Sequence, residues 1–134
     1  MTKILLIGHY GVGSALRAAA ESILDENLVQ RLQDVISFDE DRRQPERLSN
    51  RLEQVLSELA AEHDVLILSD LPGASPHNLA VQVAGHYAMP VVSGMNLPML
   101  LRCIHHQELT AMALADIAVE GARRAIFSEV PHGS

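Results

Sequence analysis

The sequence has few of the residues on which several common functions depend. Cysteine occurs once, at Cys103, tryptophan is absent, and aromatic residues make up 3% of the chain. One cysteine excludes an internal disulfide framework and is typical of a reducing compartment. So few aromatic side chains argue against stacking on nucleic-acid bases or on sugar rings.

Long apolar runs are also missing from the sequence. No run approaches the ~20 residues of a membrane-spanning helix, which argues against direct insertion into a membrane. Residues Met1 to Lys3 lead directly into a strand-like run, without the charged start, apolar stretch and cleavage site of a signal peptide. We therefore expect a cytoplasmic protein.

Basic residues are fewer than acidic ones, 10 against 17, which gives a formal net charge of −7. Nucleic-acid binding requires basic patches, so we exclude nucleic acid as a partner. Negative charge suits docking on a basic protein surface, although ordinary solubility explains it equally well. With 134 residues, 48% of them hydrophobic, the chain has the length of one folded domain, residues 1–134, and shows no repeat or interdomain linker.

The sequence contains no established motif for a metal or a nucleotide. The glycines after the first apolar run follow the order G-x-x-G-x-G (Gly8, Gly11, Gly13), which differs from the dinucleotide fingerprint, and no P-loop is present. His105 and His106 are adjacent, so on a helix their side chains diverge by about 100° and cannot share one metal ion. We therefore expect no cofactor and no metal.

Apolar runs of strand length alternate with segments of helical period. The strand-like runs are Lys3–Ile7, Leu32–Phe38, Val65–Ser69 and Met89–Ser93; the helical segments are 12–24, 45–59, 77–86, 97–106 and 108–124. This β-α-β-α order predicts a single doubly wound α/β domain with helices on both faces of a parallel sheet. The order 2-1-3-4 places strands 1 and 3 side by side, with their carboxyl ends at the crevice where open sheets bind ligands.

Polar residues follow both of these central strands. His9 comes directly after the first strand and Asp70 directly after the third, so the predicted topology brings them to one sheet edge. A carboxylate that holds the proton of one imidazole nitrogen leaves the other nitrogen free as a nucleophile. The alternatives are a histidine that only completes a turn and an aspartate that only ends a strand.

The loop after Asp70 is rich in glycine, serine and proline. The backbone around Gly73 and Ala74, together with Ser75, offers hydrogen-bond donors for a phosphate. The alternative is ordinary turn chemistry, in which Pro72 and Pro76 restrict the loop. His77 either adds charge beside a phosphate or is a solvated residue of the first helical turn, and we favour the second interpretation.

Three motifs, read together, resemble the EIIA domain of the mannose family of the bacterial phosphoenolpyruvate-dependent sugar phosphotransferase system. The first is a strand followed by a histidine and a small-residue helix start, Ile7–Leu16. The second, D-x-x-G-G-S-P-x-N in the family, corresponds to Asp70–Asn78. The third, G-x-N-[LI]-P-M-L, is matched in full by Gly94–Leu100.

The resemblance implies that His9 carries the phosphoryl group, that Asp70 orients it, and that Gly73, Ala74 and Ser75 form the loop that receives the group. It implies a donor such as the phosphocarrier HPr and an EIIB acceptor, in sugar uptake or regulation. We expect no fused EIIB domain. The sequence departs from the family at four positions: Gly8 replaces a hydroxyl residue, Tyr10 and Ala74 replace glycines, and His77 stands where an aromatic or small residue is usual.

Two other functions fit the same fold: a non-catalytic regulatory interaction module and a small-ligand binder of flavodoxin-like architecture. The pairing of His9 with Asp70 favours the phosphocarrier. A four-stranded sheet leaves strand 4 with an open edge, and the tail has an apolar run, Ala125–Phe127. The resemblance implies that this tail is a fifth, antiparallel strand exchanged in a homodimer, with the helix around Leu97–Ile104 also in the interface.

Overall fold

A four-stranded parallel sheet forms the centre of the structure, a computed structural model that describes residues 1–39 and 45–133. Its strands are β1 (Lys3–Ile7), β2 (Val35–Phe38), β3 (Val65–Ser69) and β4 (Val91–Val92). They lie in the order β2-β1-β3-β4, and every pair is parallel. The predicted topology is therefore confirmed. The connector expected at Asp39–Arg43 lies, beyond Asp39, outside the described residues.

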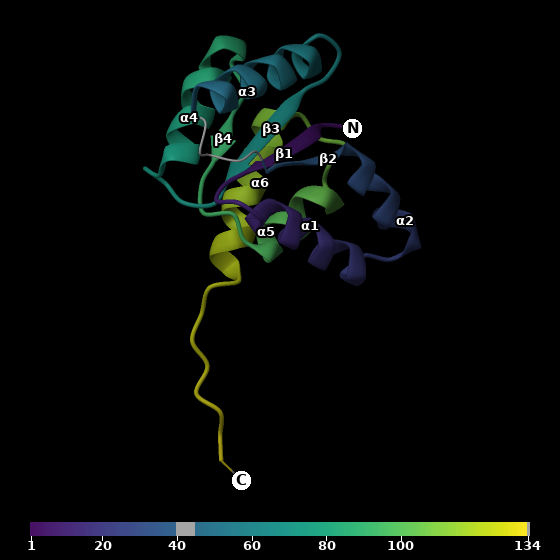
Figure 1. The fold of residues 1–134 in the computed structure, drawn as a ribbon. Helices are drawn as coiled ribbons and strands as arrows, with labels where there is room; N and C mark the ends of the chain where they lie inside the picture. The colour runs from purple at the N-terminus through teal and green to yellow at the C-terminus, as the bar shows by residue number, and fades with distance from the viewer. Residues whose placement is uncertain (40–44, 134) are drawn as a thin grey trace.

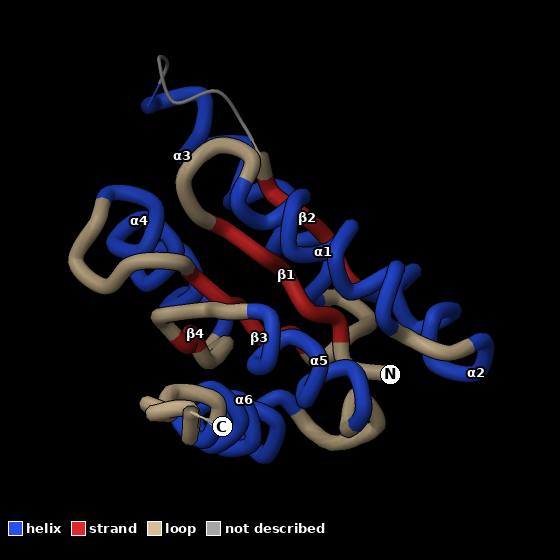
Figure 2. Tube along the Cα trace, turned by 90° about the horizontal axis from the view of Figure 1, so that it is seen from below, coloured by secondary structure: helices blue, strands red, loops and turns tan. Residues whose placement is uncertain are grey.

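Helices cover both faces of the sheet because both faces of its central strands are apolar (Figures 1 and 2). On one face, α1 (Val12–Ile23), α5 (Leu97–His105) and α6 (Ala111–Arg124) pack on alternate residues such as Ile4 and Leu66. On the other, α3 (Pro45–Ala60) and α4 (Ser75–Ala84) pack on residues such as Leu5 and Ile67. The predicted apolar stripe of α3 supplies the buried side chains of Leu48, Leu52 and Leu56.

The second strand is shorter than the sequence predicts. After the one-turn helix α2 (Glu26–Val29), residues Gln30–Asp34 form a 3₁₀ helix, η1, and β2 begins only at Val35. Leu32 is buried from this helix, so its apolar side chain reaches the core without joining a strand. Arg17 bonds the carbonyl oxygens of Leu32 (2.8 Å) and Val35 (3.1 Å) and stabilises this turn.

The fourth strand is also shorter than the predicted segment, Met89–Ser93. Ala88 has the left-handed backbone conformation, φ 54°, and Pro90 has no N–H to donate. The Pro90 carbonyl still accepts a hydrogen bond from the Ile67 N–H (3.0 Å). The strand β4 therefore begins only at Val91, and it ends at Val92.

The structure changes predicted boundaries of α4, α5 and α6. Helix α4 begins at Ser75, before the predicted His77, because Pro76 is tolerated in a first helical turn; it ends at Ala84 and is followed by the 3₁₀ helix η2 (Gly85–Tyr87). Helix α5 ends at His105, one residue early. Helix α6 begins at Ala111, after the predicted Glu108, because the Thr110 hydroxyl caps it by accepting from the Ala113 N–H (3.3 Å).

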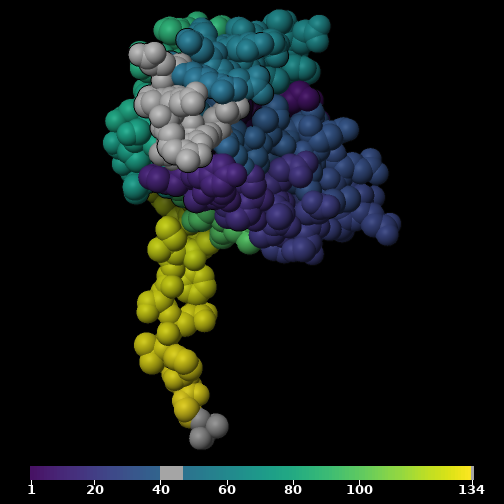
Figure 3. Space-filling model, viewed as in Figure 1, coloured from purple at the N-terminus to yellow at the C-terminus, as the bar shows by residue number. Residues whose placement is uncertain are grey.

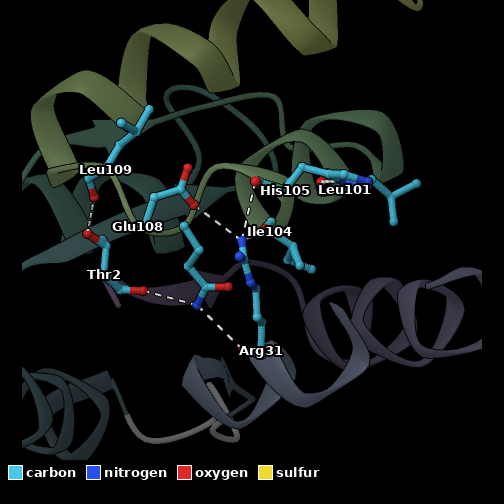
Figure 4. A network of polar contacts seen from close by, with 8 residues as sticks. Thr2, Arg31, Leu101, Ile104, His105, Glu108 and Leu109 are labelled. Atoms are coloured by element: carbon cyan, nitrogen blue, oxygen red, sulfur yellow. Dashed lines mark hydrogen bonds and ion pairs between the residues drawn. The ribbon is translucent and has the colours of Figure 1, made fainter. Parts of the chain in front are cut away.

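A polar network holds together the amino end of the sheet (Figure 4). The Thr2 hydroxyl donates to the Leu109 carbonyl, and the buried Gln107 amide donates to the Thr2 carbonyl (3.1 Å). The guanidinium of Arg31, on η1, donates to the Ile104 carbonyl (2.8 Å) at the end of α5. These bonds anchor the end of the sheet opposite His9 and Asp70.

The chain after α6 extends away from the body without regular structure over residues 125–133 (Figures 1 and 3). Its apolar side chains are exposed: Ile126 by 73%, Phe127 by 70% and Val130 by 85%. The tail therefore adds no fifth strand within its own chain, and its exchange with a second copy stays a prediction. Among the described helices, none is long and apolar enough to cross a membrane.

Candidate functional site

The register between β1 and β3 brings two loops to the same edge of the sheet. Ile7, the last residue of β1, lies opposite Ser69, the last residue of β3. The chain then continues into Gly8 and His9 on one side and into Asp70 on the other. The predicted meeting of His9 and Asp70 is found in the structure.

One carboxylate oxygen of Asp70 accepts two hydrogen bonds from His9. The His9 backbone N–H lies 2.8 Å from Asp70 Oδ2, and the ring Nδ1 lies 2.7 Å from the same oxygen. A carboxylate can only accept, so it places the ring proton on Nδ1 and leaves the lone pair on Nε2. The His9 side chain is 52% exposed, whereas that of Asp70 is 12% exposed. The nitrogen that keeps its lone pair therefore belongs to a ring that is half exposed to solvent.

Burial of the Asp70 carboxyl raises its pKa, but its interactions with His9 more than offset this effect. The hydrogen bonds from the His9 backbone and ring, and the electrostatic attraction of the His9 ring when it is protonated, hold the pKa of Asp70 below its ordinary value. The other oxygen, Oδ1, is buried and accepts no hydrogen bond from the described residues. The carboxylate charge is thus directed at His9.

Gly8 leaves the space that this carboxylate occupies. A Cβ atom at position 8 would lie 2.6 Å from Asp70 Cγ and within 2.9 Å of both its oxygens, closer than atoms in contact allow. Gly8 and Asp70 are therefore matched in size, a relation that the sequence alone did not reveal. The departure of Gly8 from the family motif is the one signal in the sequence that points to this position.

The predicted phosphate loop follows Asp70 and leads into α4. Gly73 has φ +79°, a left-handed conformation that glycine adopts without strain, and its carbonyl accepts from the Asn78 side chain (3.1 Å). The Ala74 N–H donates to the Leu71 carbonyl (3.3 Å), and Ser75 is exposed at the start of α4. Within the described residues, no hydrogen bond or ion pair joins Gly73, Ala74 or Ser75 to His9.

A second histidine lies at the same end of β3. His77, in the first turn of α4, is partly buried, and its Nδ1 lies 2.5 Å from the hydroxyl oxygen of the fully buried Ser69. Our interpretation of His77 as a solvated residue of the first turn therefore differs from the structure. The sequence reasoning missed the contact because it began the helix at His77, two residues late.

The family pattern described as the PTS system fructose IIA component, EIIA-man, matches residues 3–119 of the chain. The chain belongs to the EIIA-man family. The PTS fructose-specific EIIA component of Bacillus subtilis (strain 168) is 30% identical over 115 residues, which are 84% of this chain and 75% of that protein. EIIA proteins are components of the sugar phosphotransferase system, which agrees with phosphoryl transfer as the class of reaction.

Solved structures of EIIA proteins share the fold. A mannose/sorbose-specific IIA subunit from Enterococcus faecalis superposes with a TM-score of 0.78 at 23% identity, covering 99% of this chain and 98% of that one. An EIIA component from Streptococcus agalactiae gives 0.73 at 21% identity, covering 96% and 97%. The predicted family and its open α/β sheet are confirmed.

The match between Gly8 and Asp70 gives a testable expectation for this EIIA protein. Gly8→Ala forces the Asp70 carboxylate away from His9, so it removes the hydrogen bonds that lower the pKa of Asp70. We expect the pKa of Asp70 to rise, and the stability that the ionised carboxylate contributes to be lost at a higher pH on acidification. Carbon-13 NMR titration of the Asp70 carboxyl measures this shift.

Gly85→Ala is the matched control, because a Cβ at position 85 meets nothing within 4 Å. This variant should leave the Asp70 titration unchanged. An Asp70 titration that is the same in Gly8→Ala as in the unmodified protein would show that position 8 does not control the carboxylate.

Proposed function

We propose that the protein is a phosphohistidine carrier that accepts a phosphoryl group on His9 Nε2 and passes it to an acceptor protein. One observation carries this proposal: Asp70 Oδ2 bonds His9 Nδ1 at 2.7 Å, on a ring that is half exposed at the carboxyl edge of the sheet. The family membership supports the same class of reaction. The donor is an HPr-type phosphohistidine protein, and the acceptor is an EIIB protein or domain.

The transfer needs only an exchange of bonds at phosphorus. The lone pair of His9 Nε2 forms a new N–P bond while the N–P bond to the donor imidazole breaks, and that imidazole keeps the bonding electron pair. The His9 proton stays on Nδ1. The positive charge that develops on the His9 ring is stabilised by Asp70, whose Oδ1 has no competing donor among the described residues.

The loop after Asp70 is the proposed binding site for the transferred group. The first N–H groups of a helix have no partner within the helix, and a helix N-terminus favours negative charge. Ser75 opens α4 and is exposed, so its N–H and hydroxyl are available to phosphoryl oxygens. Gly73 and Ala74 give the loop its shape and supply further backbone donors once the Ala74 N–H turns from Leu71.

The surface beside the histidine has the character of a docking site for a protein. Tyr10 is 77% exposed next to His9, and Leu71 is 53% exposed next to Asp70. Apolar and aromatic side chains of this kind are typical anchors at protein interfaces. The net charge of −7 favours a donor or acceptor with a basic surface, and we place the exchange in the cytoplasm.

Incubation with phosphoenolpyruvate, Enzyme I and HPr should add one acid-labile phosphate, and His9→Ala should abolish this labelling because it removes the nucleophile. Intact-mass spectrometry at neutral and acidic pH measures the adduct. His63→Ala, which removes an exposed histidine next to β3's amino end, should be labelled normally. Label that persists in His9→Ala would place the acceptor elsewhere.

Asp70→Asn should leave the fold intact and slow phosphorylation of His9 by roughly one to several orders of magnitude. The amide no longer stabilises a positive ring, and it can hold the wrong tautomer. Quenched-flow labelling with phospho-HPr measures the rate. Asp116→Asn, at an exposed position of α6, is the control, and a normal rate in Asp70→Asn would make Asp70 a strand-end residue only.

We further propose that the protein is a homodimer in which the tail of each chain covers the β4 edge of the other. A groove of about 430 Å³ runs beside β4, lined in part by Val92, Met99 and Val119, with Ile126 at the base of the tail. The exposed side chains of Ile126 and Phe127 are unfavourable in water unless they are covered. A symmetric exchange that adds the tail as an antiparallel strand covers both the groove and the open edge.

Light scattering at micromolar concentration should give the mass of a dimer, and deletion of residues 125–134 should lower it toward that of a monomer. The deletion removes the segment that each chain contributes to the other as a strand. A control that ends at residue 130 retains Ile126 and Phe127 and should remain dimeric. A monomer mass for the complete chain would contradict the exchange.

A further inference from the structure

The Ser69–His77 pair is the second contact at this edge that involves a histidine, and the proposed transfer gives it no role. Ser69 is fully buried, directly before Asp70, and its Oγ lies 2.5 Å from His77 Nδ1. His77 Nε2 has no recorded partner among residues 1–39 and 45–133. Two imidazoles are thus bound through Nδ1 to consecutive residues, 69 and 70, and each leaves Nε2 available.

The buried hydroxyl determines where the His77 proton lies. A buried O–H that donates no hydrogen bond is costly, and within the described part of the chain His77 Nδ1 is the only recorded partner of the Ser69 hydroxyl. Ser69 therefore donates to Nδ1, so the neutral His77 ring carries its proton on Nε2. His77 presents an N–H donor, whereas Asp70 makes His9 present a lone pair.

His77 lies at the same sheet edge as the proposed phosphoryl site, in the first turn of the helix that follows the Asp70–Ala74 loop. The Cα–Cβ bond of a helical residue tilts toward the helix N-terminus, so the His77 ring lies on the side of the Asp70–Ala74 loop. The two nitrogens of an imidazole point in diverging directions. With Nδ1 turned to the fully buried Ser69, Nε2 points away from Ser69, and His77 as a residue is partly exposed.

We propose that His77 Nε2–H donates a hydrogen bond to an oxygen of the phosphoryl group during its transfer to His9, and that Ser69 positions His77 for this role. The inference rests on the proposed function. No proton moves in this step: His9 Nε2 forms the N–P bond, the donor imidazole leaves with the electron pair, and His77 stabilises negative charge on the phosphoryl oxygen. His77, which differs from the residues usual at this position of the family motif, is then an additional ligand of the phosphoryl group.

The test uses the full-length protein and three variants. His77→Phe removes the donor, His77→Gln keeps an N–H donor at a similar reach, and Ser69→Ala keeps the imidazole but frees its orientation. The phosphoryl source is phosphoramidate, a small donor that needs no docking surface, and phospho-HPr is used in parallel. Thermal unfolding and the NMR spectrum of His9 show whether each variant keeps the fold and the His9–Asp70 contact.

We expect His77→Phe to lower the maximal rate at His9 by about a hundredfold with either donor, the lower end of the effect of losing a single donor to a developing charge. The half-saturating concentration of phospho-HPr should change little. His77→Gln should recover most of the rate. Ser69→Ala should have a maximal rate between those of the unmodified protein and His77→Phe. The double variant Ser69→Ala/His77→Phe should be no slower than His77→Phe alone. The phosphorus-31 resonance of phosphorylated His9 should shift in His77→Phe.

Each contrary result has a distinct meaning. If the nitrogen-15 shifts of unphosphorylated protein show the His77 proton on Nδ1, or if His77→Phe is phosphorylated normally, the inference is wrong while the carrier function stands. A loss with phospho-HPr but not with phosphoramidate makes His77 a docking residue and also overturns the inference. A wild-type protein that takes up no phosphate at His9 from either donor overturns the proposed function and this inference together.

Discussion

The parallel pairing of β1 with β3 is the constraint on which the site depends. Five residue pairs join these strands, from Lys3 with Val65 to Ile7 with Ser69. A shift of one residue would turn every side chain of a strand to the opposite face and would disrupt the close packing of both helical layers on these apolar side chains. The packing of both helical layers therefore fixes the register, and the register fixes the position of Asp70 beside His9.

The topology was predictable because each central strand is apolar throughout and ends at a polar loop. Element lengths were less predictable, since they depend on competing local interactions. Leu32 is buried from a 3₁₀ turn whose carbonyl groups are bonded by Arg17, and this long-range contact has no sequence pattern. Pro76 looked like part of a loop, although its fixed φ suits a first helical turn equally well.

The same distinction separates the predicted from the missed parts of the site. His9 and Asp70 were predictable because strand ends and topology locate them without knowledge of side-chain packing. The role of Gly8 depends on a distance of less than 3 Å between a missing Cβ and the Asp70 carboxylate. The Ser69–His77 contact depends on where α4 begins. Neither is encoded in residue spacing alone, but both involve residues that depart from the family motif or adjoin it.

The groups that hold the two imidazoles give them opposite character. A carboxylate only accepts hydrogen bonds, so Asp70 keeps the His9 proton on Nδ1 and leaves a lone pair on Nε2. Because His77 Nδ1 is the one hydrogen-bond partner of the buried Ser69 hydroxyl among the described residues, we infer that Ser69 donates to it and leaves the His77 proton on Nε2. In the proposed transfer, two consecutive residues at the end of one strand thus produce a nucleophile and a hydrogen-bond donor from the same type of side chain. Transfer of an anionic group needs both, one to attack phosphorus and one to stabilise its oxygens.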